Sequence, residues 1–155
     1  CFGTKDGCVR KFSDGNTAGD YNDYDTAGDE TGHPVQAAWA TPLLNLGTWA
    51  NLKNVTGVWV VFQPFARSGG EIYYATDKEY EKLVRSANVD IFDWNDIDFQ
   101  RFTFNTLDRP MIVNTRKKAK KVKLFQVVVK NERDKEPFGL FAIHVNYKVG
   151  GKVKR

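Results

Sequence analysis

Apolar side chains alternate with polar ones through most of the chain after residue 35, and this period of two constrains the fold more than any other feature. The strongest segment is 55–65. It is expected to present two apolar faces, one carrying Val58, Val60 and Phe62 and the other Val55, Trp59 and Val61. Successive side chains of a β-strand point to opposite faces, so this segment predicts a central strand that is covered on both sides.

Shorter segments of the same kind follow one another with turn residues between them. The expected strands are 35–40 with its partner 43–47, then 71–76, 99–104, 111–114, 122–130 and 138–148. In the last two strands, the side chains expected to share a face are Phe125, Val127 and Val129, and Phe141, Ile143, Val145 and Tyr147. One helix candidate, 77–86, begins with Asp77 as its N-cap. The pattern predicts an all-β fold, an antiparallel two-layer β-sandwich of jelly-roll-like type with at most one short helix.

The first 34 residues differ in charge and composition from the rest of the 155-residue chain. They carry three basic and seven acidic side chains, net −4, whereas the remaining 121 carry 20 and 12, net +8. Residues 2–12 are expected to form a hairpin left from an upstream domain, and whether Cys1 and Cys8 are bridged across it stays open. Residues 13–32 are rich in Gly, Asp, Asn and Thr, which is typical of a linker. The predicted domains are therefore 1–34, the hairpin with its acidic linker, and 35–155, the sandwich.

Motifs of enzymes, metal sites and membrane spans are absent from the sequence. There is no Gly-rich phosphate loop and no paired-histidine motif, and His33 and His144 stand far apart. Four aspartates surround Trp94, namely Asp90, Asp93, Asp96 and Asp98; we favour an acidic connecting loop over the carboxylate pair of a glycosidase. The acidic segment 20–29 lacks the spacing of a calcium loop. No apolar run approaches the ~20 residues of a membrane helix. The sequence predicts no enzyme, cofactor, metal or membrane partner.

The segment 115–123 is strongly basic. Its candidates for contacts to nucleic-acid phosphates are Lys117, Lys118, Lys120 and Lys121. The segment has no interleaved aromatic residues on which bases could stack, and it leads directly into a strand. Lysines in that position commonly prevent a sheet edge from pairing with other chains. We favour this edge protection, and contact with DNA is the second interpretation.

The larger aromatic residues divide by their sequence context. Trp39 and Trp59 lie in apolar strands and are expected to pack in the core or in an interface. Trp49 and Trp94 lie in polar loops. Together with Tyr73, these two are the candidate residues for a protein interface or for a platform that binds a sugar ligand.

The order of several short motifs resembles the C-terminal sandwich domain of tailed-phage tail proteins. Residues 39–47, WATPLLNLG, match that family's Trp-x-Thr-Pro-Leu-x-x-x-Gly strand, and GVWV at 57–60 follows a lysine-bearing loop. YYATD at 73–77 matches a strand that ends in Thr-Asp. PFGLFAIHVNY at 137–147 matches a Pro-Phe-x-Leu-x-x-Ile-x-Val-x-Tyr strand near the family's end. Residues 2–12 are similar to the last hairpin of the β-propeller that precedes the sandwich.

This resemblance implies a structural component of the virion, located in the tail. It brings no catalytic residues, and it implies copies of the same chain in a ring and other tail proteins as partners. A carbohydrate-binding β-sandwich module that uses exposed aromatic residues is the alternative function.

Overall fold

The computed structural model describes residues 2–3, 9–10, 22–23 and 33–152, the last range without 66, 95–96, 98, 101, 107–108, 116–117 and 134–135. Two short antiparallel pairs come first. β1 (Phe2–Gly3) pairs with β2 (Val9–Arg10), and β3 (Asn22–Asp23) pairs with β4 (His33–Pro34). The β1–β2 pairing agrees with the expected hairpin, whereas Cys1 and Cys8 lie outside the described residues. The division of the chain at residue 34 stays a prediction.

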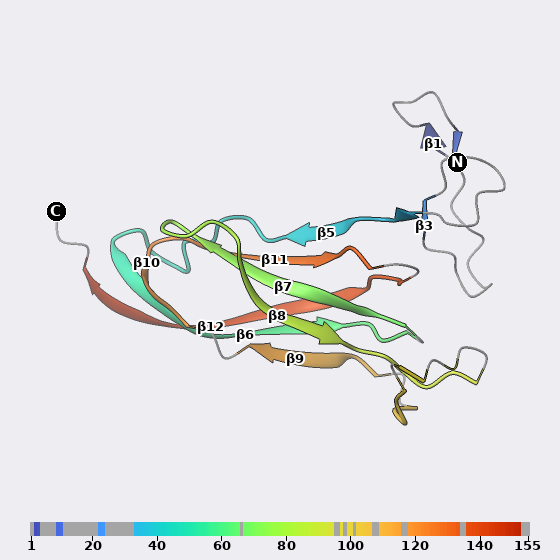
Figure 1. Cartoon of the computed structure of the whole chain (residues 1–155). Helices are drawn as coiled ribbons and strands as arrows, with labels where there is room; N and C mark the ends of the chain where they lie inside the picture. Colours follow the sequence, from blue (N-terminus) through green and yellow to red (C-terminus); the bar gives the residue numbers. More distant parts are fainter. Residues whose placement is uncertain are drawn as a thin grey trace.

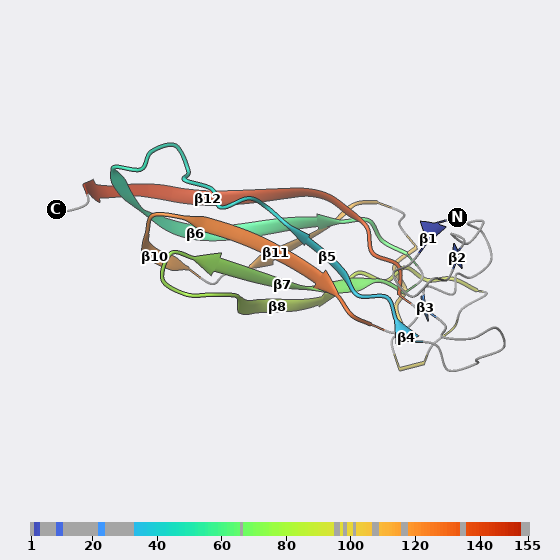
Figure 2. The ribbon, with the colours of Figure 1, turned by 90° about the horizontal axis from the view of Figure 1, so that it is seen from above.

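Two four-stranded antiparallel sheets form the body of the protein (Figure 1). The first has the order β5-β11-β7-β8, with bounds Ala37–Ala40, Phe125–Asn131, Gly69–Thr76 and Lys82–Asn88. In the second, β6 (Asn51–Phe62) lies in the centre; β12 (Leu140–Lys152) pairs with one side of it, and β9 (Met111–Thr115) and β10 (Ala119–Val122) with the other. Seen from above, the strands of both sheets run along one long direction (Figure 2). This arrangement confirms the predicted antiparallel two-layer β-sandwich.

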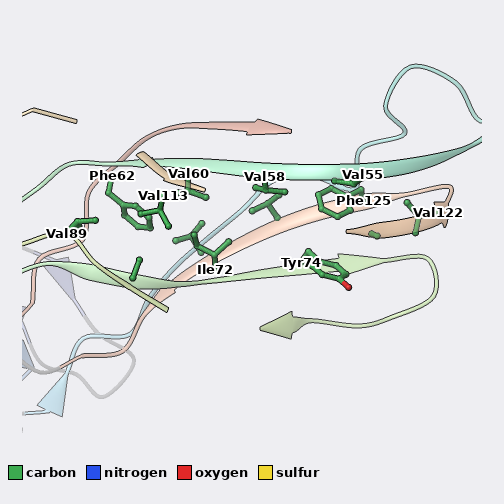
Figure 3. Close-up of a cluster of buried hydrophobic side chains, with 14 residues drawn as sticks. Val55, Val58, Val60, Phe62, Ile72, Tyr74, Val89, Val113, Val122 and Phe125 are labelled. Atoms are coloured by element: carbon green, nitrogen blue, oxygen red, sulfur yellow. The ribbon is translucent and has the colours of Figure 1, made fainter. Parts of the chain in front are cut away.

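The core lies between the two sheets, and short apolar side chains from both of them fill it (Figure 3). Phe125, Val127 and Val129 of β11 are all buried, as the alternation predicts. Ile72 and Tyr74 of β7 pair directly with two of these residues and share their face. On the opposite sheet, β6 contributes Val55, Val58, Val60 and Phe62.

The prediction that Val55 faces away from Val58 is wrong. Asn146 of β12 pairs with Gly57, and the next residue of β12 pairs with Val55, so Thr56 is an extra residue in β6. An extra residue of this kind is a β-bulge, and it shifts the alternation of side chains by one position. As a result, both valines are buried on the inner side of the sheet.

A second bulge overturns the expected position of Phe141 in β12. The register shifts between Leu140 and Ala142, and Leu140 packs against the core in place of Phe141, which is exposed. Ile143 and Val145 do pack against the core. Trp39 does not pack in the core, because β5 is a four-residue strand at the sheet edge and this side chain is exposed; packing in an interface stays a prediction.

The helix expected at 77–86 is wrong, because this region forms the turn after β7 and most of β8. Thr76 N–H donates to Glu79 O at 2.8 Å, which closes the β7–β8 turn. The Asp77 carboxylate caps a different segment: it accepts hydrogen bonds from the N–H groups of Lys123 and Leu124, at 2.9 and 3.4 Å. Residues 77–86 therefore belong to a β-hairpin, in which β8 pairs with β7.

The turn at Lys123 and Leu124, which the Asp77 carboxylate caps, divides the predicted strand 122–130 into β10 and β11. These two strands belong to different sheets. The predicted strand 43–47 is also wrong. In that segment only Leu44 forms a bridge, to Phe125, and residues 46–47 form a turn with positive φ at both positions.

β6 runs along the length of the sandwich and defines its two ends. Lys53, near the start of β6, pairs with Val122 of β10, and Phe62 at its end pairs with the first residue of β9. The β5–β6 connection and the β7–β8 turn lie at the β10 end, whereas the long β8–β9 connection lies at the opposite end (Figure 1). The 12 residues of β6 separate these ends by about 40 Å.

Candidate functional site

The β8–β9 connection is attached firmly at its base. Phe65 O accepts from Ile91 N–H at 2.9 Å, and Ser68 O accepts from Val89 N–H at 3.0 Å. The Asp90 carboxylate accepts from Ser68 N–H at 2.9 Å. Farther along, Phe92 N–H donates to Asn105 O at 2.7 Å and joins the two arms of the loop. These hydrogen bonds attach residues 89–92 and Asn105 to the end of the sandwich.

Five aromatic rings contact one another within this loop, and we call them the aromatic loop cluster: Phe92, Trp94, Phe99, Phe102 and Phe104. Phe92 meets Trp94 edge-to-face at 4.9 Å between ring centroids. Phe102 meets Phe92 and Phe104 edge-to-face, at 5.7 and 4.8 Å, and stacks on Phe99 at 6.4 Å. Such geometries are the favourable ones for aromatic pairs, so each ring helps to orient its neighbours.

Most of this aromatic surface faces solvent. Trp94 is 79% exposed, Phe99 87% and Phe104 85%, and the neighbouring Ile97 is also exposed. Isolated apolar side chains are ordinary on protein surfaces, but a contiguous apolar patch marks an interaction site. The aromatic loop cluster can bury several large rings against a partner without first rearranging its own core.

The sequence pointed to only one member of this cluster, Trp94, as a candidate site residue. The prediction of a strand at 99–104 is wrong, because the described residues of that segment form no strand. The alternation of Phe102 and Phe104 suggested a strand, but their rings pack on each other across the loop. The useful signal was the composition of 90–98, in which aromatic residues alternate with Asp and Asn, because these polar residues favour turns.

The three aromatic candidates from the sequence lie on different surfaces. Trp49, 63% exposed, belongs to the β5–β6 connection at the β10 end, opposite the end with Trp94. Tyr73 lies in the middle of β7, where it pairs with Val128, and its ring has the Lys130 ammonium 5.0 Å from its centroid. No single ligand platform combines these side chains.

Tyr73 is part of a charged network on the outer face of its sheet. Its hydroxyl donates to the Glu71 carboxylate, and Lys130 forms an ion pair with Glu81 at 2.6 Å. The hydrogen bond to Glu71, helped by desolvation and by the surrounding negative charges, raises the pKa of Tyr73 to about 12. Negative charge near a phenol disfavours the phenolate.

This shift predicts a dependence of stability on alkaline pH. The folded-state pKa of Tyr73 lies above the ordinary value of 10.0, so its contribution is complete below pH 10 and is lost as the pH rises through about 12. In Tyr73→Phe, the free energy of unfolding, measured by urea titration, should fall less between these pH values than in the parent. The exposed Tyr80 supplies the control, and Tyr80→Phe should behave as the parent does. Equal pH dependence in all three proteins would contradict the role assigned to Tyr73.

The predicted basic candidates lie at the β10 end, apart from Lys117, which is outside the described residues. Lys118, Lys120 and Lys121 are exposed around β10, whereas Ala119 and Val122 of the same strand are buried. β10 is an edge strand in which two consecutive lysines face solvent. This arrangement agrees with the interpretation that the lysines protect the sheet edge.

Among the described residues, the remaining candidates for chemistry form no catalytic or metal-binding group. Asp96, Asp98 and most of the segment 20–29 lie outside the described residues, and the Asp90 carboxylate is used in holding Ser68. His144 lies opposite Trp59 on the outer face of β12 and is exposed. Among the described side chains, no group of three His, Cys, Asp or Glu residues could hold a metal ion.

Over the described part of the chain, no helix has the length and apolar character needed to cross a membrane. Comparisons of the chain with protein-family models, with curated proteins and with solved structures find no match.

Proposed function

We propose that this chain is a non-enzymatic assembly module that works through protein–protein contacts, as a structural component of a phage virion tail. The tail assignment comes from the sequence motifs at 39–47 and 137–147 and from their order. The observation that carries the assembly role is the aromatic loop cluster, whose rings contact one another and form an exposed apolar surface at one end of the sandwich.

The composition of the aromatic loop cluster supports a protein partner. Interfaces between proteins concentrate their binding energy in a few tryptophan, tyrosine and arginine side chains at the centre of the contact. Phe and Trp rings that already contact one another lose little side-chain freedom on binding, so more of the gain from burial is kept. A sugar platform is less favoured because Trp49, Tyr73 and Trp94 lie on separate surfaces.

Loss of the aromatic surface should prevent assembly. We expect a phage that carries Trp94→Ala together with Phe104→Ala to yield at least about tenfold fewer infectious particles, because truncated anchor residues commonly cost more than 2 kcal/mol each. The measurement is the particle titre, with the amount of soluble chain in the host checked by immunoblotting.

The matched control is Phe141→Ala, which removes another exposed ring from a different element, β12. Its particle yield should equal that of the parent. A normal yield from the doubly substituted phage would contradict the proposed role of the loop.

A further inference from the structure

The two ends of the sandwich differ in charge. Residues 90–109, which contain the aromatic loop cluster, include five aspartates and two arginines, net −3. At the opposite end, four exposed lysines surround β10, and we call them the lysine cluster: Lys118, Lys120, Lys121 and Lys123. The chain therefore presents exposed aromatic rings in a segment of net negative charge at one end, and a basic surface about 40 Å away.

The carboxylates near the lysine cluster already have other partners. Glu79 pairs with Lys82 at 3.4 Å and accepts a hydrogen bond from the Tyr74 hydroxyl at 3.1 Å. Glu81 pairs with Lys130, and Asp77 caps the backbone of the β10–β11 turn. Within the described part of the chain, the lysine cluster has no side-chain ion pair. Its positive charge is thus available to an outside partner.

Exposed aromatic rings in a segment of net negative charge are complementary to a lysine-rich surface. Ammonium groups bind over the faces of Trp and Phe rings, with Trp the most favourable, and they also pair with carboxylates. The lysine cluster adjoins the β5–β6 connection, which carries the exposed Trp49 and Leu43 as apolar contacts. Both surfaces are present on every copy of the chain.

We infer that the aromatic loop cluster of one copy binds the lysine cluster of a second copy, in a head-to-tail contact. This inference rests on the proposed function and deepens it by naming the partner surface. A contact between two different surfaces of identical chains is heterologous, so each copy keeps one free surface after binding. Repetition of the contact produces a ring where the rotation closes, or a filament where it does not.

Two variants that each destroy one surface test the inference with purified full-length chain. The loop variant carries Trp94→Ala and Phe104→Ala, and the lysine variant carries Lys118→Glu and Lys120→Glu. By sedimentation velocity, each variant alone should self-associate at least about tenfold more weakly than the parent. An equimolar mixture should form a complex of two copies only, because the loop of the lysine variant can still bind the lysine cluster of the loop variant.

The control, Asn114→Glu with His144→Glu, adds two carboxylates on the outer face of the β6 sheet, on either side of Trp59 and between the two ends. It should associate as the parent does. The parent complex should also weaken when salt rises from about 0.05 to 0.5 M, because the contact is partly ionic.

Two results would overturn the inference: a parent that stays monomeric up to about 1 mM, or a mixture that associates no better than either variant alone. If the purified chain gives either of these results but the loop-variant phage still gives a low particle yield, the proposed function stands and the aromatic loop cluster binds a different partner.

Discussion

Replacement of Phe125 by alanine is expected to lower the free energy of unfolding by about 3–5 kcal/mol. The Phe125 side chain is only 1% exposed and stacks on Tyr74 of the neighbouring strand, with ring centroids 5.7 Å apart. It lies between the two sheets, opposite Val55 (Figure 3). The surrounding strands cannot close the cavity fully, because their positions are fixed by pairing, so both burial and packing are lost.

Urea unfolding followed by tryptophan fluorescence measures this loss. The same chemical change at an exposed position of β12, Phe141→Ala, is the control and should alter stability by no more than about 0.5 kcal/mol. Comparable losses at both positions would show that the core does not lie where the two sheets place it.

Replacement of Gly69 by alanine should destabilise the fold by about 1–3 kcal/mol, although alanine is usually the better residue inside a strand. A Cβ atom at this position would lie 2.5 Å from the carbonyl oxygen of Ala87 on β8 and 2.6 Å from Nη1 of Arg133. Neither neighbour can move easily. The carbonyl belongs to the paired strand, and Arg133 donates to Asn88 at 2.6 Å and to Ser86 at 2.9 Å.

Gly151→Ala is the matched control, because a Cβ atom there would have no other atom within 4 Å. Its free energy of unfolding should equal or slightly exceed that of the parent. If Gly69→Ala proves as stable as Gly151→Ala, the close approach of β7, β8 and the Arg133 side chain is not as described.

The fold class and the long central strands were predictable from the sequence because the sandwich buries alternate side chains. Val58, Val60 and Phe62 follow this rule, and so do Phe125, Val127 and Val129. The rule fails where a strand contains an extra residue. Gly57 is a sequence signal for the bulge, because a glycine inside a strand often marks one, but the extra residue itself depends on how β6 pairs with β12, about 90 residues later.

The prediction of a helix at 77–86 was wrong for a related reason. Asp77 is a good N-cap residue, and the local sequence has no way to show that its carboxylate is used by the β10–β11 turn instead. The candidate site was predictable only in part, through Trp94. Its other members were assigned to a strand, because aromatic residues that pack on one another in a loop have the same alternation as residues in a strand.

The lysine candidates illustrate how position decides between two functions of the same residues. Lys120 lies on an edge strand, where its charge discourages uncontrolled pairing of strands. The same charge at the β10 end offers a surface to an acidic partner. Edge protection and specific docking are compatible, because the first uses the backbone edge and the second uses the ammonium groups.

The central claim is that this chain is built into a phage tail through repeated protein contacts. Quantitative mass spectrometry of purified particles, with tails separated from heads, tests it most directly. The account predicts that the chain is present in the tail fraction in several copies per particle. Its absence from the particles, together with binding of the purified chain to a glycan at a Kd of about 1–10 μM, would contradict the account and favour a carbohydrate-binding module.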